Sequence, residues 1–366
     1  MSAGPRLSFT HWTVTVPVIA VVALAITWKR ELPGWAVVVV AILLGGAVLA
    51  AVHHAEVVAS RVGEPFGSLV LAVAVTVIEV ALIVTLMLDG GPKAASLARD
   101  TVFAAVMITC NGIVGLSLLT GSLRRRVAVF NPEGTAAALA TVVTLATLTL
   151  VLPTFTTSAP GPEYSSAQLT FAAIASLVLY LLFVSIQTVR HRDYFLPITT
   201  DGRVIDTEEH AAPPTAKAAW LSLGLLLVAL VAVVGDAKTI SPAIEQGISA
   251  ASLPQAVVGV VVALLVLLPE TLAAVRAAQR DRIQTSLNLA YGSAMASIGL
   301  TIPTIAVASI WLQGPLVLGL GATQLVLLAL TVVTGIITLV PGRATPLQGG
   351  VHLAVLAAFL FLALSP

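Results

Sequence analysis

Residues 66–88 read FGSLVLAVAVTVIEVALIVTLML, an apolar run that contains a single ionisable side chain, Glu79. A helix rises about 1.5 Å per residue, so this run is long enough to cross the roughly 30 Å hydrocarbon layer of a bilayer. Glu79 lies thirteen residues after Phe66 and nine before Leu88. The stretch therefore predicts a membrane-spanning helix that carries a carboxylate near the bilayer centre.

The rest of the chain has the same character. It has 366 residues, of which 58% are hydrophobic and 10% charged, whereas soluble domains are about 25% charged. Apolar runs recur at 12–28, 35–52, 66–88, 101–121, 135–154, 168–187, 218–235, 254–275, 284–310, 317–340 and 348–365. We expect an all-α polytopic membrane protein with about eleven transmembrane helices. The net charge of +1 gives no basic field for a nucleic-acid partner.

The first run could imitate a secretory signal. It is longer than a usual signal core, and it is followed by Lys29-Arg30-Glu31-Leu32-Pro33-Gly34 rather than by small residues for cleavage. We interpret it as a retained first span. The single cysteine, Cys110, excludes an internal disulfide framework and is expected to fill space in a helix.

Positive residues predict the orientation. Thirteen of the eighteen Lys and Arg residues fall on the side of the N-terminus and five on the other side. Cytoplasmic loops carry the excess of positive charge. We therefore expect a cytoplasmic N-terminus and, with eleven spans, an outside C-terminus.

The spans divide into an N-terminal helix (1–34), a first five-helix repeat (35–187), a linker (188–217) and a second five-helix repeat (218–366). An odd number of spans per repeat forces the repeats into opposite orientations, as in many secondary transporters. The linker on the cytoplasmic side holds Arg190, His191, Arg192, Asp193, Asp206, Glu208, Glu209 and His210. It is interpreted as a solvated loop, with a regulatory cation site as the alternative.

A second acid, Glu270, lies at the corresponding place in the second repeat, in the second helix of that half. Pro269 precedes it and frees a backbone carbonyl in the preceding turn. A carbonyl beside a carboxylate is the hard oxygen chemistry that calcium prefers. A carboxylate at mid-membrane costs about 2.5–3.5 kcal/mol on insertion scales.

The two acids have two interpretations. A protonated glutamate could simply hydrogen-bond across helices. The alternative, favoured by the equivalent places of Glu79 and Glu270, is a shared site at the interface of the two halves. Either a divalent cation or protons neutralise it, and competition between them produces antiport. No Walker motif is present, so ATP drive and a cofactor are not expected.

Other residues supply oxygens inside the same or following runs. Thr76 shares a helix face with Glu79, because it precedes it by three positions. The candidate auxiliary ligands are Thr76, Asn111, Pro269, Thr271, Asn288, Ser293 and Ser297. Packing is the alternative for the serines and for Gly112, Gly115, Gly292 and Gly299. His53, His54, Glu56 and Glu64 are expected at the cytoplasmic mouth, and Asp89, Asp100 and Asp236 at span ends, with no histidine deep in a span.

Three motifs resemble the calcium/cation antiporter superfamily, and most closely its bacterial ChaA-type branch. They are Gly63-Glu64-Pro65-Phe66-Gly67-Ser68-Leu69 running to Glu79, Leu267-Leu268-Pro269-Glu270, and Asn288-Leu289-Ala290-Tyr291-Gly292-Ser293-Ala294 ending at Ile302-Pro303. The resemblance implies eleven helices, inverted repeats, and calcium export against proton entry, with Glu79 and Glu270 binding the ions. Thr76 and Leu267 stand where the family has asparagine, so Na⁺ or K⁺ is a further candidate substrate.

The expectation is an antiporter of alternating access that exchanges Ca²⁺ for H⁺, with a Na⁺ or K⁺/H⁺ antiporter as the alternative. An intramembrane enzyme is disfavoured because neither His-Glu-x-x-His nor Gly-x-Ser-x-Gly occurs. A channel is disfavoured because pores usually arise from oligomeric symmetry, whereas one chain here holds two inverted halves. The oligomeric state is not predicted.

Overall fold

A computed structural model of the chain describes residues 12–63, 66–90, 94–198, 213–311 and 314–366. The chain forms two compact units, and each unit is built from two separate stretches. Unit 1 comprises Met1–Ala94 and Glu209–Leu253, and unit 2 comprises Ala95–Glu208 and Pro254–Pro366. The units do not follow the boundaries of the two expected repeats, which remain a prediction. Each unit is described by itself.

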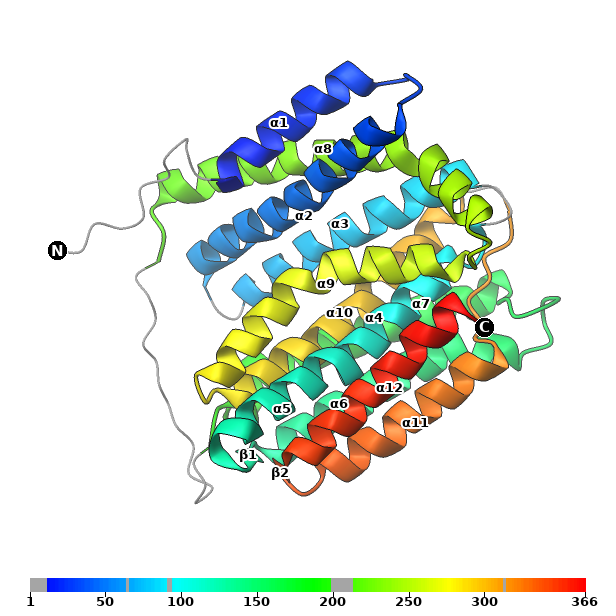
Figure 1. The fold of residues 1–366 in the computed structure, drawn as a ribbon. Helices are drawn as coiled ribbons and strands as arrows, with labels where there is room; N and C mark the ends of the chain where they lie inside the picture. The colour runs from blue at the N-terminus through cyan, green and yellow to red at the C-terminus, as the bar shows by residue number, and fades with distance from the viewer. Residues whose placement is uncertain (1–11, 64–65, 91–93, 199–212, 312–313) are drawn as a thin grey trace. The chain divides into compact units, whose positions relative to one another are not determined.

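Unit 1 is a bundle of four helices. They are α1 (Trp12–Thr27), α2 (Gly34–Val62), α3 (Phe66–Gly90) and α8 (Ala216–Ala250). Helices α1, α2 and α8 pack against one another, and α3 packs on α2 and α8 (Figure 1). Two glycines allow close approach: a methyl group built on Gly46 would lie 2.8 Å from Val16 Cγ1, and one on Gly235 would overlap Leu24.

Unit 2 contains the remaining elements. The first stretch forms α4 (Leu97–Met107), the π-helix η2 (Ile108–Ile113), α5 (Val114–Arg125), β1 (Ala128–Val129), α6 (Pro132–Ala146), the π-helix η3 (Thr147–Val151), the 3₁₀ turn η4 (Leu152–Thr154), α7 (Ser166–Ser185), the π-helix η5 (Ile186–Arg190) and the 3₁₀ turn η6 (Arg192–Phe195). The second stretch forms α9 (Ala256–Gln279), α10 (Ile283–Ala308), α11 (Ala322–Leu339), β2 (Arg343–Ala344) and α12 (Pro346–Leu364).

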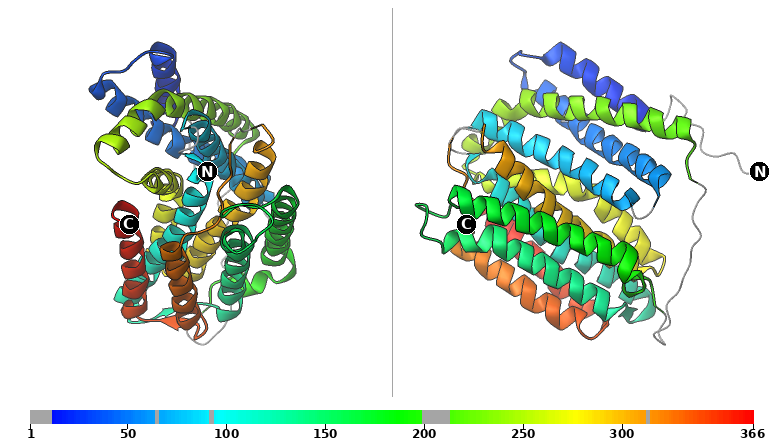
Figure 2. Two further views of the ribbon diagram at one scale, coloured as in Figure 1. Left: turned by 90° about the vertical axis from the view of Figure 1, so that its right-hand side faces the viewer. Right: turned by 180° about the vertical axis from the view of Figure 1, so that it is seen from behind.

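The continuous span α4–η2–α5 is the central element of unit 2. Its apolar window within Leu97–Leu123 is 89% buried. The span packs against α9, α10 and α12, while α10 also packs on α6 and α7. Helices α7, α6 and α11 lie side by side in this order on one face of unit 2 (Figure 2). A two-stranded pairing of β1 with β2 joins the ends of α5 and α11.

Local sequence signals explain where several helices begin and end. Asn131 accepts hydrogen bonds from the amides of Glu133 and Gly134 at 3.0 and 3.5 Å, which caps α6, and Pro132 occupies its first position. Ser165 and Gln168 form a capping box at the start of α7. Gly63 ends α2 at a φ of 78°, in the region that favours glycine.

The all-α polytopic architecture is confirmed. Within the described residues, ten helices are long and apolar enough to cross a membrane, and the shorter apolar helix α1 precedes them. Two expected helix ends are wrong by ten residues or more. Helix α2 continues to Val62 rather than to residue 52, and α8 continues to Ala250 rather than to residue 235. No glycine or proline occurs between residue 47 and Gly63 to end α2 earlier.

The longer helices change the environment of several polar residues. His53, His54 and Glu56 lie inside α2 rather than in a polar segment between the second and third spans, and His54 is fully buried. Asp236 lies inside α8 and is fully buried, so it is not an interfacial residue at a span end. Glu64 and the linker residues Asp206, Glu208, Glu209 and His210 lie outside the described residues.

Candidate functional site

Glu79 is a buried acid on α3 of unit 1. Its side chain is 4% exposed, and that of Thr76, one helical turn earlier, is 6% exposed. The three-residue spacing puts both side chains on the same face of the helix. Most of the residues around them on α3 are aliphatic, so the carboxylate and the hydroxyl are the principal oxygen atoms of this face. The pair therefore provides one acid and one neutral oxygen for a cation or a proton.

Glu270 lies on α9 of unit 2, directly after Pro269, and its side chain is half-buried. Proline has no amide hydrogen, so the carbonyl of Leu265 loses its intrahelical donor. The Thr271 hydroxyl donates to the carbonyl of Leu267 at 2.7 Å and keeps its oxygen lone pairs for another contact. Glu270, the Leu265 carbonyl and Thr271 thus form a short oxygen-bearing segment inside an otherwise apolar helix.

Close packing fixes α9 against α4. A methyl group built on Gly259 would lie 2.8 Å from the carbonyl carbon of Asp100 and 2.8 Å from the amide nitrogen of Thr101. Both contacts are with backbone atoms, which cannot move aside as a flexible side chain can. Gly259 therefore allows the two helices to touch, eleven residues before Glu270.

Asn111 lies in the π-helix η2 and takes part in a buried network of four side chains. Its Nδ2 donates to Thr331 Oγ1 at 2.9 Å, and its Oδ1 lies 3.3 Å from His352 Nδ1. His352 Nε2 lies 3.2 Å from Thr338 Oγ1. An amide oxygen only accepts, so His352 Nδ1 donates to Asn111; in a neutral imidazole with this tautomer, Nε2 accepts from the Thr338 hydroxyl. The network joins η2, α11 and α12.

This network bears on the prediction for Asn111. Its amide is fully buried and already bonded to two other helices. Asn111 as a cation ligand therefore remains a prediction that requires these bonds to open. The expectation that no histidine lies deep in a span is wrong, since His352 is fully buried within α12. The sequence feature that could have indicated a buried polar network is the pair Thr331 and Thr338, which lie two turns apart on one face of α11.

Asn288 on α10 is also engaged. Its Nδ2 donates to the carbonyl of Phe195 at 2.7 Å, and its Oδ1 accepts from Gln284 Nε2 at 2.9 Å. Gln284 in turn accepts from the amide of Asn131 at 2.7 Å. These bonds tie the start of α10 to η6 and to the start of α6. Of the other α10 candidates, Ser297 is buried and Ser293 is half-buried, and their role as ligands remains a prediction.

The small residues that were predicted to allow close approach divide into two groups. Gly112 and Gly115 pack against Leu356 and Leu353 of α12, and Gly299 packs against Tyr180 of α7. Gly292, by contrast, has open space where a side chain would be. A bridge of hydroxyls adds to this packing: Ser117 and Ser286 lie 2.5 Å apart, and Ser286 donates to the carbonyl of Ala274.

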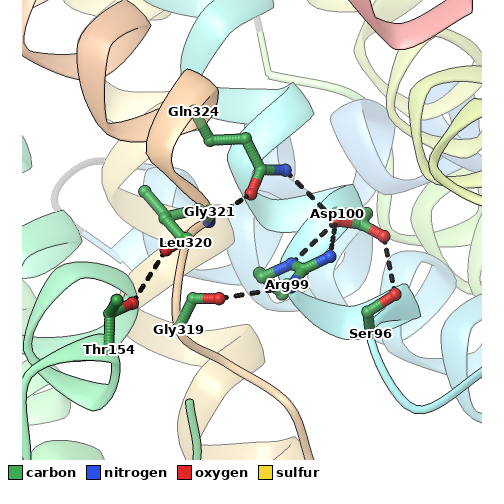
Figure 3. A network of polar contacts seen from close by, with 8 residues as sticks. All are labelled: Ser96, Arg99, Asp100, Thr154, Gly319, Leu320, Gly321 and Gln324. Atoms are coloured by element: carbon green, nitrogen blue, oxygen red, sulfur yellow. Dashed lines mark hydrogen bonds and ion pairs between the residues drawn. The ribbon is translucent and has the colours of Figure 1, made fainter. Parts of the chain in front are cut away.

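A charged cluster fixes the N-terminal end of α4 (Figure 3). Asp100 is 4% exposed and accepts from Arg99, from Ser96 and from Gln324 at 2.8, 2.8 and 3.3 Å. Arg99 also donates to the carbonyl of Gly319 at 3.2 Å. The cluster joins α4 to the segment before α11. Asp100 is therefore near the end of its span, as expected, but its carboxylate is bonded inside the protein.

The described residues thus place Glu79 and Thr76 in unit 1, and the other candidates in unit 2. No group of three or more His, Cys, Asp or Glu side chains in the described part of the chain could hold a metal ion. That Glu79 and Glu270 serve one site remains a prediction from the sequence. The residues that the sequence analysis missed as buried polar groups are His54, Asp236 and His352.

Comparisons with known proteins cover almost the whole chain. The model of the family described as sodium/calcium exchanger protein matches residues 32–189 and 221–365. The chain is 46% identical over 362 residues to y4hA of Sinorhizobium fredii, whose name proposes an ionic transporter, with 97% of this chain and 96% of that protein covered. It is 33% identical over 348 residues to the sodium-potassium/proton antiporter ChaA of Escherichia coli, with 94% and 93% covered.

A solved structure shows the same fold. The structure of native YfkE matches with a TM-score of 0.71 at 16% identity, and covers 98% of this chain and 99% of that one. A second structure of that protein is described as a Ca²⁺/H⁺ antiporter. At this identity the match supports the helical architecture alone.

Proposed function

The chain belongs to the sodium/calcium exchanger protein family, and on this premise we propose that it exchanges Ca²⁺ for protons across a membrane. It is an integral membrane protein and a transmembrane antiporter of that family. One observation carries the proposal: each of two membrane-spanning helices, α3 and α9, holds one glutamate within its apolar run. The proton gradient supplies the drive.

Charge explains why the two ions would exchange. Two ionised glutamates carry two negative charges, which one divalent cation or two protons neutralise. Ionised acids inside a membrane are costly. In both the inward-open and the outward-open state, the two glutamates must therefore bind a cation or protons before the protein changes the side to which they are open. Because Ca²⁺ and protons compete for the same oxygens, binding of one releases the other. Repeated on both sides of the membrane, this competition gives antiport by alternating access.

The neighbouring oxygens support a hard cation as substrate. Calcium takes six to eight oxygen ligands, and these include carboxylates, carbonyls and water. Thr76 contributes a hydroxyl beside Glu79, while Thr271 and the Leu265 carbonyl contribute oxygens beside Glu270. Both acids and all three neutral oxygens lie in spanning helices. Because water is scarce inside a membrane, oxygens of the protein must supply part of the ligand set of the cation.

A second candidate is exchange of Na⁺ or K⁺ for protons. It is favoured by the named activity of the ChaA relative, which is a sodium-potassium/proton antiporter. It is also favoured by Leu267, which is 3% exposed and offers no side-chain oxygen three residues before Glu270. A site with fewer side-chain oxygens binds a divalent cation less strongly, because such ions demand more and harder ligands.

We also propose a bacterial cytoplasmic membrane as the location, with the N-terminus in the cytoplasm. The bacterial relatives y4hA and ChaA support the location, and the excess of Lys and Arg on the N-terminal side supports the orientation. In this orientation the start of α2 lies outside and its end inside. A cysteine introduced at exposed Trp35 should then react with an impermeant thiol reagent added to intact cells, and one at exposed Arg61 should not.

The experiment that tests the function is transport in proteoliposomes that contain only the purified chain. A proton gradient is imposed, and Ca²⁺, Na⁺ or K⁺ is added in turn while a pH-sensitive dye is followed. Dissipation by Ca²⁺ supports the first proposal. Dissipation by Na⁺ or K⁺ without Ca²⁺ supports the second candidate, and no dissipation by any of the three contradicts cation/proton antiport.

A further inference from the structure

Asp236 is a fully buried acid in the interior of unit 1. It lies on α8, twenty residues after the helix begins and fourteen before it ends. Neither of its carboxylate oxygens has a hydrogen-bond partner among the described residues. The apolar residues Ala232, Val233 and Ala237 flank it and are buried as well. The surroundings on its own helix are therefore hydrocarbon rather than polar.

The charged groups of the helices around Asp236 do not compensate it. Helix α1 has no ionisable side chain between Trp12 and Thr27, and Lys238 of α8 is exposed on the opposite side of the helix. The remaining ionisable residues are His53, His54, Glu56 and Arg61 of α2, Glu79 and Asp89 of α3 (the Asp89 side chain is outside the described part), and Lys217 and Glu245 of α8.

The buried histidine of this unit lies at the other end of α1. His54 Nε2 bonds to the carbonyl of Thr13 at 2.9 Å, whereas Leu24 covers Gly235, next to Asp236. Thr13 and Leu24 are eleven residues apart, which is about 16 Å along a helix. His54 is therefore too far from Asp236 to share a proton with it directly.

Two features connect Asp236 to movement of the bundle. Leu24 of α1 lies against Gly235, the residue before Asp236, so α1 packs on α8 directly beside the acid. Pro242 lies inside α8 six residues later, and its missing amide leaves the carbonyl of Lys238 without an intrahelical donor. Helix α8 bends in this region (Figure 1). The two halves of a helix can move relative to each other at a proline kink.

Elementary energetics decide the charge state. An ionised carboxylate without hydrogen bonds or a counter-ion is so costly in an apolar interior that the group takes up a proton instead. A cation is a poor alternative occupant, because one carboxylate is far from the six to eight oxygens that Ca²⁺ takes. The acid can lose its proton when its cover opens and water reaches it.

We propose that Asp236 is a proton-binding site of the transport cycle, separate from Glu79 and Glu270, which holds a proton while α1 covers α8 and releases it when unit 1 rearranges. The sequence supplies no equivalent acid in the first half. The two glutamates are 191 residues apart, and the same offset maps Asp236 onto Gly45 of α2. The proton site is thus a feature of the second half alone. The transport part of this proposal rests on the proposed function.

The first test measures the proton itself, without transport. Infrared spectra of the purified chain in lipid are recorded at neutral pH for the wild type, Asp236→Asn and Glu245→Gln. Glu245 is the matched control, since it is a half-buried carboxylate on the same helix. We expect a carbonyl band of a non-hydrogen-bonded carboxylic acid that is lost in Asp236→Asn and kept in Glu245→Gln. A spectrum in which Asp236→Asn removes only a carboxylate band would overturn the proposal.

A second variant leaves the acid in place and changes its cover. Leu24→Ser replaces the apolar side chain that lies against Gly235 with a small polar one, so that water can approach the acid, and should shift the carboxylic acid band or convert it to a carboxylate band. An unshifted acid band in folded Leu24→Ser protein contradicts a role of α1 in keeping water from this acid. This variant also decides the question if Asp236→Asn fails to fold.

The last test measures the transport cycle. The pH dependence of cation-driven proton movement is compared for the wild type, Asp236→Asn and Glu245→Gln. We expect Asp236→Asn alone to lose the limb of the profile that reports release of this proton. An unchanged profile in Asp236→Asn would show that the proton does not cycle. If the wild type moves no cation, the proposed function fails while the infrared result still decides whether Asp236 holds a proton.

Discussion

Two buried aspartates, one in each unit, differ in their hydrogen bonding. Asp100 of unit 2 accepts hydrogen bonds from Ser96, Arg99 and Gln324, whereas Asp236 of unit 1 has no hydrogen-bond partner among the described residues. The buried histidines differ in the same sense. Both ring nitrogens of His352 in unit 2 have side-chain partners. Among the described residues, His54 in unit 1 has one hydrogen-bond partner, the backbone carbonyl of Thr13 at Nε2.

The difference concerns how each unit holds its helices. A fully satisfied polar network fixes one arrangement of helices, because every alternative leaves buried groups unpaired. Networks of this kind join α4, η2, α11 and α12 in unit 2. Unit 1 holds α1 on α2 and α8 through contacts such as Leu24 on Gly235 and Val16 on Gly46. Apolar contacts are less directional, so we expect unit 1 to rearrange more easily.

The largest expected effect comes from glycine substitutions. In Gly349→Val, the added Cβ would lie 2.6 Å from the amide nitrogen of Leu119 and 2.9 Å from the carbonyl oxygen of Gly115. Both atoms belong to the backbone of α5, which cannot move aside as a side chain can. We therefore expect the free energy of unfolding to fall by more than about 3 kcal/mol, or the protein not to fold. Gly350→Val is the matched control, because it meets no atom within 4 Å. Thermal unfolding in detergent measures both.

A glycine substitution in unit 1 should have a smaller effect than the equivalent substitution in unit 2. Gly235→Ala meets the end of the flexible Leu24 side chain rather than backbone. We expect the melting temperature to fall much less than in Gly349→Ala, whose added Cβ meets backbone atoms. Equal losses at the two positions would contradict the view that unit 1 yields more easily than unit 2.

A smaller effect is expected from the network at η2. Asn111→Leu leaves buried Thr331 and His352 each without one partner, at a cost of about 1–3 kcal/mol for each group. Unfolding in a denaturant series measures the loss. In a double-mutant cycle, Thr331→Val should cost less when combined with Asn111→Leu than alone. Additive losses would show that the two side chains do not act as one network.

The smallest effect is expected at an exposed ion pair. Arg125 and Asp281 lie 2.8 Å apart, with side chains 66% and 43% exposed. Such pairs contribute up to about 1 kcal/mol, so Asp281→Asn should scarcely change the melting temperature. Asparagine also tolerates the φ of 61° at this position. Asp100→Asn should lower the melting temperature more, and the reverse order would contradict the role of the buried cluster.

Much of this fold could be predicted from sequence, because the length and hydropathy of each run set the spans. Helix ends were harder: the apolar run of α8 stops near Gly235, whereas the helix continues to Ala250 through Asp236 and Lys238. Hydropathy measures which residues prefer lipid, not whether the backbone stays helical. The spans could not reveal that Asp236 faces the protein interior, since this depends on how α1 packs on α8.

The functional residues divide in the same way. Glu79 was identified because an acid in an apolar run is conspicuous, and the structure describes it as buried. The bonds of Asn111 to Thr331 and His352 could not be predicted, since the partners lie 220 and 241 residues away in the chain. Contacts at such separations arise from helix packing, which periodicity within a single span does not encode.

The most direct measurement for the central claim is proton-coupled transport by Glu79→Gln and Glu270→Gln, each reconstituted separately beside the wild type and Glu245→Gln. We expect each glutamine variant to fold, as shown by its melting temperature, and to lose cation-dependent dissipation of the proton gradient. Glu245→Gln should retain it. Full transport by either folded variant, Glu79→Gln or Glu270→Gln, would contradict the claim that these two acids carry the exchanged ions.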